Sequence, residues 1–364
     1  MNLQFDEDQQ LLQQSLDRYL EKRLPFDIRR SQKGGGEFLA FWRAMDAELG
    51  VAAAGLPEEL GGFAGGSESE MTIAAAQGRA LAVTPYIACH VLSATLLESV
   101  GATAMAKAIA EEGLLVTTAI EEPQTRGDVS LVETRASETG DGWTLSGTKL
   151  VVDFASHANL VLIPTRLEGG ELGLFAVEPA ALGSSLKPYA LIDDTPSADI
   201  LLDHLNVPAD ALIARGESVL PALAAAVDRA LSALCAESAG IASVMVADTV
   251  AYSKEREQFG VPISSFQALQ HRMVDMWAKA QEIEAASLLA ALKVDQPCAV
   301  SAAKATASDG LRRIGQEAVQ LHGAMGLTEE LRVGHYFKRA TVLEYKLGSA
   351  ADHVERYRKT RQAA

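Results

Sequence analysis

The stretch REQFG, residues 256–260, closes an alanine-rich helical segment and is followed directly by Val-Pro. Gly260 and the proline after it end a helix, because glycine suits a left-handed C-cap and proline cannot continue the helix. A guanidinium fixed at such a helix end can form paired, charge-assisted hydrogen bonds with phosphate oxygens. Two interpretations follow: Arg256 belongs to a solvated helix end, or Arg256 and the loop after it hold an anionic group.

Two acids are the other candidates for chemistry. Glu237 lies in the apolar stretch LCAESAGIA. A buried carboxylate needs a partner or a raised pKa, so Glu237 has either a structural hydrogen-bonding role or a functional one. Glu344 lies beside Lys338, Arg339 and Lys346. These neighbours favour a surface or ion-paired Glu344, with a role in a pocket as the alternative.

The elements that must position these residues run in the order helix, strand, helix. Residues 1–113 carry apolar residues at three-to-four-residue spacing, which predicts helices. The first such stripe is Phe5, Leu11, Leu12, Leu16, Tyr19 and Leu20, and a second helix, FLAFWRAMDAELG, ends at Gly50. Residues 114–216 hold six or so short, β-branched or alternating runs between turn residues, which predict a small all-β domain. Residues 217–364 return to helix, with Ser264 or Ser265 as the expected N-cap of a long amphipathic helix.

Bulk composition excludes several classes of protein. A chain of 364 residues is long enough for two or three packed units. The net charge of -16 argues against general nucleic-acid binding, which needs a basic surface. Three scattered cysteines form no metal-like pair and are typical of reduced thiols in a cytoplasmic protein. The chain shows neither a signal-peptide pattern nor an uninterrupted apolar run of about 20 residues, so we expect no membrane span.

Five motifs in this order resemble those of the acyl-CoA dehydrogenase family. They are LPEELGGFAGG, AIEEPQTRGD, GWTLSGTKLVVDFASHANLVLIPTR, REQFGVPISSFQALQHRMVDM and QLHGAMGLTEE, and they extend over essentially the whole chain. The last two are specific, because they combine spacing with rare residue types. The resemblance implies an α+β fold with an N-terminal helical domain, a middle β-barrel domain and a C-terminal four-helix bundle.

The resemblance also implies FAD as cofactor, an acyl-CoA thioester as substrate and electron-transfer flavoprotein as acceptor. In this family the Arg of the REQFG-like motif reaches the diphosphate of a flavin at a subunit interface, and the Phe packs by the cofactor. Carried over to this chain, the cofactor-binding residues are Arg256, Phe259, Gln267, Gln320, Gly323 and Gly326. No metal is implied.

The catalytic base is missing from both positions that the family uses. The commoner position precedes a Gly after the last long helix and is Leu347 here, and the alternative position is Ala230. Neither residue is a carboxylate, although removal of the α-proton of a thioester requires one. The remaining acids that could serve are Glu237 and Glu344.

The chain also departs from the family's motifs at other positions, mainly ones that face the flavin. Glu121 stands where the family has a Thr, VVD (151–153) where it has Trp-x-Thr, and Ala324 where it has a Gly. The phosphate-side motifs are kept while the base is lost. The chain therefore resembles the small subunit of heteromeric acyl-CoA dehydrogenases, of the pimeloyl-CoA or steroid-catabolism type, in which a related partner chain supplies the base. Two alternatives remain: a homomeric dehydrogenase that uses Glu237 or Glu344, and a catalytically silent structural subunit.

Overall fold

The computed structural model of the chain describes residues 7–32 and 37–363, so Phe5 of the first predicted stripe lies outside the described residues. The chain divides into two compact units, each built from separate stretches of sequence. One comprises residues 1–32, 67–82 and 231–364, and the other comprises residues 33–66 and 83–230. The segments 1–113, 114–216 and 217–364 divide the chain by secondary-structure type, and their boundaries remain predictions.

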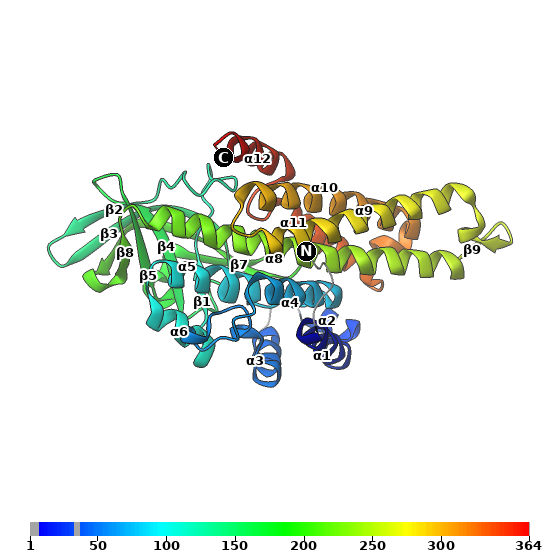
Figure 1. Cartoon of the computed structure of the whole chain (residues 1–364), viewed down its shortest axis with the longest axis horizontal. Coiled ribbons are helices and arrows are strands. Elements are labelled where there is room, and N and C mark those ends of the chain that lie inside the picture. The colour runs from blue at the N-terminus through cyan, green and yellow to red at the C-terminus, as the bar shows by residue number, and fades with distance from the viewer. Residues whose placement is uncertain (1–6, 33–36, 364) are drawn as a thin grey trace. The chain divides into compact units, whose positions relative to one another are not determined.

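The first unit is helical, as the ribbons in Figure 1 show. Its helices are α1 (Glu7–Arg23), α2 (Phe26–Ser31), α4 (Gly66–Ala80), most of α8 (Val219–Glu255), α9 (Gln267–Leu292), α10 (Pro297–His322), α11 (Arg332–Tyr345) and α12 (Ala350–Ala363). A hairpin of β9 (Glu257–Gln258) and β10 (Val261–Pro262), followed by the 3-10 turn η6 (Ile263–Ser265), connects α8 to α9. A second 3-10 turn, η7 (Gly323–Leu327), follows α10, which packs against α9, α11 and α12. The described part of residues 217–364 contains five α-helices, α8 to α12, so the C-terminal segment is helical as predicted, and its grouping as a four-helix bundle remains a prediction.

Two glycines let α4 and α8 pack with their backbones in contact. A Cβ atom on Gly78 would lie 2.3 Å from the carbonyl oxygen of Glu237, and one on Gly240 would lie 2.2 Å from that of Ala75. Neither position tolerates a side chain without a shift of backbone. This close crossing buries the part of α8 that carries Glu237.

Helix α9 confirms the predicted amphipathic helix, but its N-cap differs from the predicted one. Met273, Met276, Ala280 and Ile283 are buried, as a helix face at this spacing predicts. Trp277 is 56% exposed. The predicted serine N-cap is wrong: the N-cap is Phe266, and no side chain caps the helix. Both serines are taken up by the η6 turn, where the Ser265 hydroxyl donates to the Pro262 carbonyl.

The second unit combines short helices with one sheet. Its helices are α3 (Glu37–Leu49), η1 (Val51–Ala53), η2 (Glu58–Leu60), the π-helix η3 (Tyr86–Ser93), α5 (Ala94–Ser99), α6 (Thr103–Glu111), α7 (Pro179–Leu182), η4 (Gly183–Ser185) and η5 (Ala209–Ala211). The strands are β1 (Val116–Thr118), β2 (Arg135–Thr139), β3 (Gly142–Asp153), β4 (Leu160–Arg166), β5 (Leu172–Val177), β6 (Leu186–Ala190), β7 (Pro196–Pro208) and β8 (Leu212–Arg215). Gly50 ends α3 with a φ of 64°, which confirms its predicted left-handed C-cap.

The sheet is open, which corrects the predicted β-barrel. Its order is β6-β7-β3-β2-β4-β5-β8, with β1 joined to β4 in parallel. Among the described strands β6 pairs only with β7, and β8 pairs only with β5, so the two ends do not meet. β6 is short and mostly exposed, and its Pro188 cannot donate a ladder hydrogen bond, which suits an edge strand. Alternating runs of residues predict strands but do not decide closure.

The core of the sheet is apolar and lies on one face. Trp143, Leu145, Val161, Ile163 and Phe175 are buried in it, and the Trp143 and Phe175 rings meet edge to face. The alternation of buried and open positions along β3 is what the sequence pattern predicts for a half-buried strand.

Helix α8 is also the one described helix that is long and apolar enough, by length and composition, to cross a membrane. Its most apolar 18-residue window has a mean hydropathy of 1.6, and 78% of that window is buried inside the protein. Such burial is common for a core helix.

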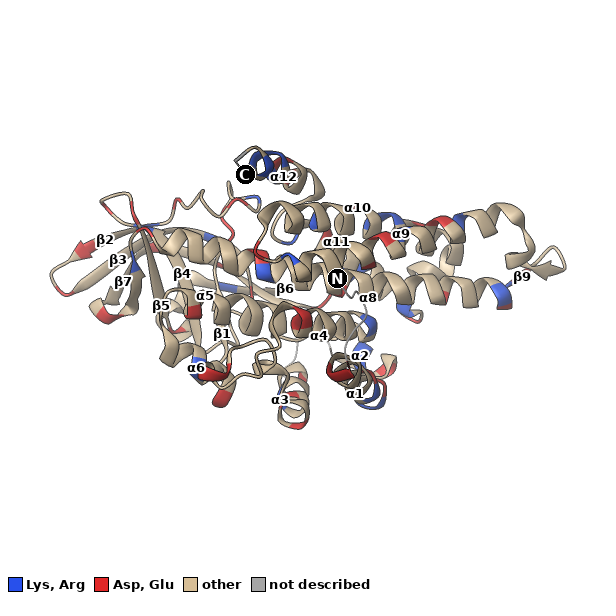
Figure 2. Cartoon of the chain, in the orientation of Figure 1, with Lys and Arg blue, Asp and Glu red and all other residues tan. Residues whose placement is uncertain are grey.

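Along α9 and α10 of the helical unit, Lys and Arg alternate with Asp and Glu (Figure 2).

Candidate active site

Arg256 is the first residue after α8 and is held by its backbone alone. Its N–H donates to the Tyr252 carbonyl at 2.9 Å, and its carbonyl accepts the Ile263 N–H at 2.8 Å. The guanidinium is exposed and makes no hydrogen bond or ion pair with another described residue. An exposed guanidinium that forms no ion pair with another described residue is available to an anionic ligand.

The turn after Arg256 presents an aromatic ring to solvent at a strained position. Gln258 pairs with Val261 across the β9–β10 hairpin, so Phe259 and Gly260 form its two-residue turn. Their φ angles are 57° and 81°, a pattern that suits glycine and is costly for Phe. Phe259 is 91% exposed and touches the Phe266 ring edge to face at 6.2 Å. Figure 1 shows this hairpin at the tip of the long α8 and α9 helices.

The remaining residues of the predicted phosphate-binding set lie on neighbouring elements of the same unit. The Tyr252 ring stacks on His322 at 4.4 Å, which joins the end of α8 to the end of α10. Gln320 is exposed in the last turn of α10, and Gln267 is exposed at the first position of α9. The fold therefore presents one cation and two amides on the joined ends of three helices.

The two predicted glycines have different roles. Gly323 has a φ of 60°, and a Cβ atom built on it would meet nothing within 4 Å, so its backbone faces open space. Gly326 is buried, and a Cβ atom there would lie 2.8 Å from the Val319 carbonyl oxygen. Gly323 suits close approach by a ligand, whereas packing against α10 explains Gly326.

Both base positions are apolar and buried. Ala230 is 1% exposed within α8, and Leu347 is 8% exposed after α11. Leu347 has a φ of 54°, which is uncommon for a bulky residue. His353 Nε2 donates to the Leu347 carbonyl at 2.9 Å and helps to fix this turn. Neither position can accept a proton.

The first candidate acid, Glu237, is committed to an ion pair. Arg339 of α11 donates from Nε to Oε1 at 2.7 Å and from Nη2 to Oε2 at 2.8 Å. Glu237 is 5% exposed. Two parallel charge-assisted bonds hold the carboxylate in one orientation and occupy both of its oxygens. The geometry favours the structural interpretation of Glu237 over that of a general base.

The second candidate acid, Glu344, is also turned toward basic groups. Its side chain is 17% exposed and lies 3.5 Å from Arg312 Nε. The buried Lys304 donates to the carbonyl of Leu343, the residue before Glu344, at 2.8 Å. Burial lowers the pKa of Lys304 to about 8. The charge of Glu344 opposes that shift. Glu344 therefore matches the predicted ion-paired role.

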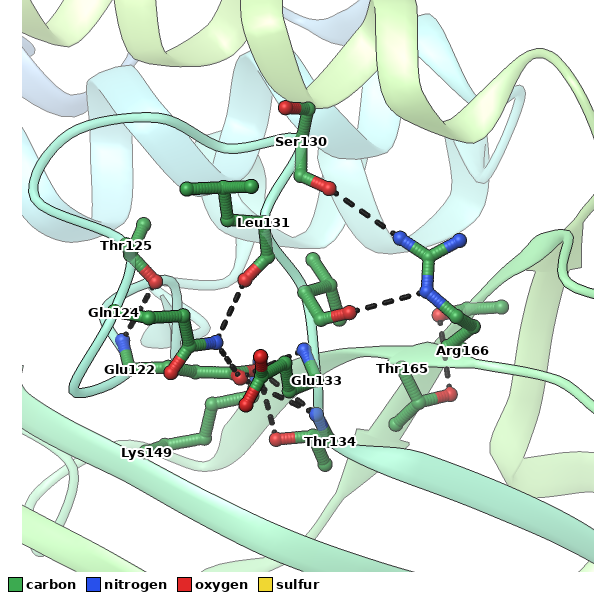
Figure 3. Close-up of polar contacts among 12 residues, drawn as sticks. Glu122, Gln124, Thr125, Ser130, Leu131, Glu133, Thr134, Lys149, Thr165 and Arg166 are labelled. Carbon is green, nitrogen blue, oxygen red and sulfur yellow. Dashed lines mark hydrogen bonds and ion pairs between the residues drawn. The ribbon is translucent and has the colours of Figure 1, made fainter.

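The loop 119–128 is anchored by a buried ion pair, shown in Figure 3. Lys149 donates to Glu122 at 2.6 Å, and the same carboxylate accepts from Gln124 Nε2 at 2.7 Å and from the N–H of Glu133 at 2.8 Å. Thr134 donates to it from Oγ1 at 2.8 Å. Burial opposes ionisation, but Lys149 and these donors outweigh it and lower the pKa of Glu122. Burial also lowers the pKa of Lys149, against the field of Glu122.

Comparisons with known proteins agree with this fold. Residues 6–112 match the model of the acyl-CoA dehydrogenase N-terminal domain, and residues 224–358 match that of the C-terminal domain. The acyl-CoA dehydrogenase IpdE2 of Mycolicibacterium smegmatis is 30% identical over 356 residues, which are 96% of this chain and 97% of that protein. This chain belongs to the acyl-CoA dehydrogenase family.

Two solved structures named for pairs of proteins share the fold. The Tcur3481-Tcur3483 steroid ACAD G363A variant aligns with a TM-score of 0.85 at 26% identity, over 98% of each chain. The ChsE4-ChsE5 complex from Mycobacterium tuberculosis aligns with a TM-score of 0.86 at 23% identity, over 100% of each chain. Acyl-CoA dehydrogenases are FAD-dependent oxidoreductases that act on CH–CH bonds, which confirms the predicted family, enzyme class and cofactor.

The residues of this acyl-CoA dehydrogenase fit the phosphate side of FAD. The exposed Arg256 guanidinium, the two exposed amides of Gln267 and Gln320, and the open backbone at Gly323 suit an anionic diphosphate. Each of these groups faces solvent in the single chain. They therefore also suit a cofactor that a second chain helps to enclose.

Sequence reasoning missed several buried polar groups of this acyl-CoA dehydrogenase. Lys149 and Lys304 are 0% and 2% exposed, and His90 is 3% exposed with no hydrogen-bond partner at either ring nitrogen among the described residues. Lys149 sits in an alternating strand and Lys304 in an amphipathic helix, where a lysine is usually on the solvent side. The one available signal was the fixed spacing of Lys149 within the motif GTKLVVD.

Proposed function

We propose that this chain is one subunit of a heteromeric FAD-dependent acyl-CoA dehydrogenase, in which a related partner chain supplies the catalytic base. The proposal rests on a contrast between two sets of residues in the chain. The phosphate-side residues Arg256, Gln267 and Gln320 are present and exposed, whereas both base positions, Leu347 and Ala230, are apolar. A chain that worked alone would need a carboxylate at the α-carbon of the substrate.

The chemistry assigns a limited part to this chain. Dehydrogenation of an acyl-CoA removes the α-proton of the thioester, and FAD, when bound, accepts the hydride from the β-carbon. This chain's own residues bind and orient: Arg256 holds the diphosphate by charge-assisted bonds, and the two glutamines add neutral hydrogen bonds. Phe259 supplies an apolar surface beside the cofactor. The proton acceptor belongs to the partner.

The names of similar proteins support the partner and the substrate class. The Tcur3481-Tcur3483 and ChsE4-ChsE5 structures are each named for two proteins, and the first is named a steroid ACAD. We extend this to a mixed oligomer, a heterotetramer of two related chains, that acts on an acyl-CoA of lipid or steroid catabolism. Electron-transfer flavoprotein is the proposed acceptor, and the cytoplasm is the proposed location.

Two other functions compete with the heteromer. A homomeric dehydrogenase would use Glu237 or Glu344, but both acids are ion-paired, Glu237 with two bonds to Arg339. A silent structural subunit would have no need of an exposed Arg256 or of an exposed Phe259 at a strained turn. The heteromer accounts for both observations.

The deciding experiment measures flavin content and oligomeric mass. The chain is purified alone and again after co-expression with a related acyl-CoA dehydrogenase chain encoded beside it. We expect a colourless or weakly coloured protein alone, and a yellow mixed oligomer with about one flavin per pair of chains. A homogeneous homo-oligomer, replete with flavin and active on an acyl-CoA by itself, would refute the heteromer.

A further inference from the structure

An open groove runs along α8 and α9. Its volume is about 1220 Å³, and every residue that lines it belongs to the helical unit. Residues at intervals of four form two of its walls, and all of them are exposed: Ser243, Ala247 and Ala251 on α8, and Trp277, Gln281 and Ala285 on α9. Pockets for small molecules are enclosed and hold roughly 300–1,000 Å³. A groove that is larger and open along its length suits an element of another protein chain instead.

The α9 wall of the groove carries large apolar side chains that the single chain leaves in water. Trp277 is 56% exposed, and Val274, one turn before it, is 60% exposed. Leu288 lies on the same face further along the helix and lines the groove, where it is half-buried. Exposed apolar faces with polar rims are typical of protein contacts, and tryptophan is the most frequent anchor in them. We call Val274, Trp277, Gln281, Ala285 and Leu288 the α9 stripe.

The spacing of the α9 stripe is the same in both directions along the chain. Its five residues are separated by three, four, four and three positions, with Gln281 in the middle. These intervals keep all five on one face of the helix, over a length of about 21 Å. When two copies of α9 lie antiparallel about a two-fold axis at Gln281, Trp277 faces Ala285 of the other copy, and Val274 faces Leu288. A large ring therefore meets a small side chain on both sides of the axis.

Gln281 is the residue that meets its own copy in this arrangement. Its Nε2 donates to Glu284 of the same helix at 3.2 Å. Its carbonyl oxygen and its second N–H have no partner among the residues that the structure describes. An amide carries both a donor and an acceptor, so two glutamines related by a two-fold axis can bond each other. A polar pair at the centre of an apolar seam also fixes the register of two helices.

The α8 wall allows the second helix to approach closely. Ser243, Ala247 and Ala251 leave a shallow channel along α8, and small side chains at a helix contact permit interaxial distances near 8 Å. The rim of the groove holds charges of both signs, with Lys254 on α8 and Glu284 on α9. Each chain offers one α9 helix and receives one, which is the self-complementary contact of a two-fold dimer.

We propose that the groove receives a second copy of this chain, with the two α9 helices antiparallel about Gln281. The pairing goes beyond the proposed function, because it joins two identical chains and involves no cofactor. In the proposed heterotetramer it is the contact between the two copies of this chain. The related partner chain then binds elsewhere.

The first test is disulfide cross-linking of the chain at the two-fold axis. Cys298 is the half-buried cysteine among those described, and Ser replaces it in every variant. Gln281→Cys is oxidised with copper phenanthroline, and we expect a covalent homodimer on a non-reducing gel. Gln270→Cys is the matched control, because Gln270 is an exposed glutamine on the same helix, eleven residues before Gln281. Two copies of residue 270 are about 33 Å apart in this arrangement, which is too far for a disulfide.

The second test is the homodimer dissociation constant, measured by sedimentation over a concentration series. We expect Val274→Glu to weaken the homodimer by about thirtyfold or more, since it places a charge inside an apolar interface. Val354→Glu is the matched control: it makes the same change at a helical valine that is 59% exposed, on α12. Trp277→Ala is the second variant and removes the anchor without adding a charge. Circular dichroism confirms that each variant is folded.

The results either support the pairing or overturn it. A wild-type chain that stays monomeric would overturn it, as would equal cross-linking of Gln281→Cys and Gln270→Cys. Cross-linking of Gln281→Cys to the related chain in the mixed oligomer, and not to its own copy, would overturn it too. Flavin content tests the proposed function separately. A colourless homodimer supports the pairing and leaves the heteromer standing, whereas a flavin-replete, active homodimer supports the pairing and refutes the heteromer.

Discussion

Glu237 and Arg339 face one another across α8 and α11 in a two-pronged ion pair, with both carboxylate oxygens accepting from the guanidinium at 2.7 and 2.8 Å. Glu237 is buried and Arg339 half-buried. A general base must present a free carboxylate oxygen to the substrate, whereas both oxygens of Glu237 accept hydrogen bonds from Arg339. The pair therefore links the question of the catalytic base to the stability of the helical unit.

Glu237→Gln is expected to destabilise the protein by about 3 kcal/mol, because it removes the buried negative charge that accepts two hydrogen bonds from Arg339. Urea unfolding measures the loss. The double variant Glu237→Leu with Arg339→Leu removes both charges, and we expect it to recover much of the stability. Exchange of the substrate α-proton with deuterated solvent in the mixed oligomer should persist in Glu237→Gln. Complete loss of that exchange in a folded variant would make Glu237 the base.

Arg256→Gln is expected to lower FAD retention in the mixed oligomer by about tenfold to a hundredfold, since a charge-assisted phosphate contact contributes roughly 1.5–3 kcal/mol. Flavin absorbance after gel filtration measures it. Arg313→Gln is the matched control, because Arg313 is an exposed arginine on α10, where it pairs with Asp309. Equal flavin content in the two variants would remove Arg256 from the cofactor site.

Phe259→Gly is expected to preserve the thermal stability of the chain while it lowers flavin binding or assembly with the partner. Glycine accepts the φ of 57° at this turn without strain, so thermal stability should stay the same or rise by up to about 1 kcal/mol. The lost ring is 91% exposed and contributes little to folding of the single chain. Flavin content or mixed-oligomer yield should nevertheless fall. A variant that assembles and binds flavin as wild type does would show that the ring is dispensable.

Lys149→Met is expected to cost about 3–5 kcal/mol, because Glu122 would remain buried and charged among neutral donors. Adding Glu122→Gln should return part of that loss, and a double-mutant cycle measured by urea unfolding gives the coupling. The pair is within the sheet-bearing unit, so the effect should appear in the chain purified alone. Additive losses in the cycle would show that the two side chains do not interact.

Stability is expected to fall on acidification through buried histidines. Burial lowers the pKa of His90 to about 3, below its ordinary value near 6.5, so the folded chain binds fewer protons than the unfolded chain between these values. The contribution of His90 to the free energy of unfolding is complete above about pH 6.5 and is lost as the pH falls toward 3. His90→Phe should unfold with a shallower pH dependence over this range, and at neutral pH it should gain about 1 kcal/mol, since no polar atom is left unpaired. If the free energy of unfolding depends on pH equally steeply in His90→Phe and in wild type, the His90 ring is hydrated in the folded chain.

The sequence determined the order of elements and the family, and it predicted the phosphate-side residues. Arg256, Gln267 and Gln320 lie in motifs of fixed spacing, and helix ends place such residues by local geometry alone. The resemblance to the family places the two base positions at Leu347 and Ala230, and neither residue is a carboxylate. These conclusions needed only neighbouring residues along the chain.

Only the tertiary structure decided the partners of the buried charges and the closure of the sheet. Glu237 meets Arg339 across 102 residues, and Lys149 meets Glu122 across 27. The Val151 N–H donates to the Asp199 side chain, 48 residues away. Such contacts depend on how separate elements pack, because hydrogen bonds to side chains and the pairing of edge strands are not encoded in the local alternation of residues.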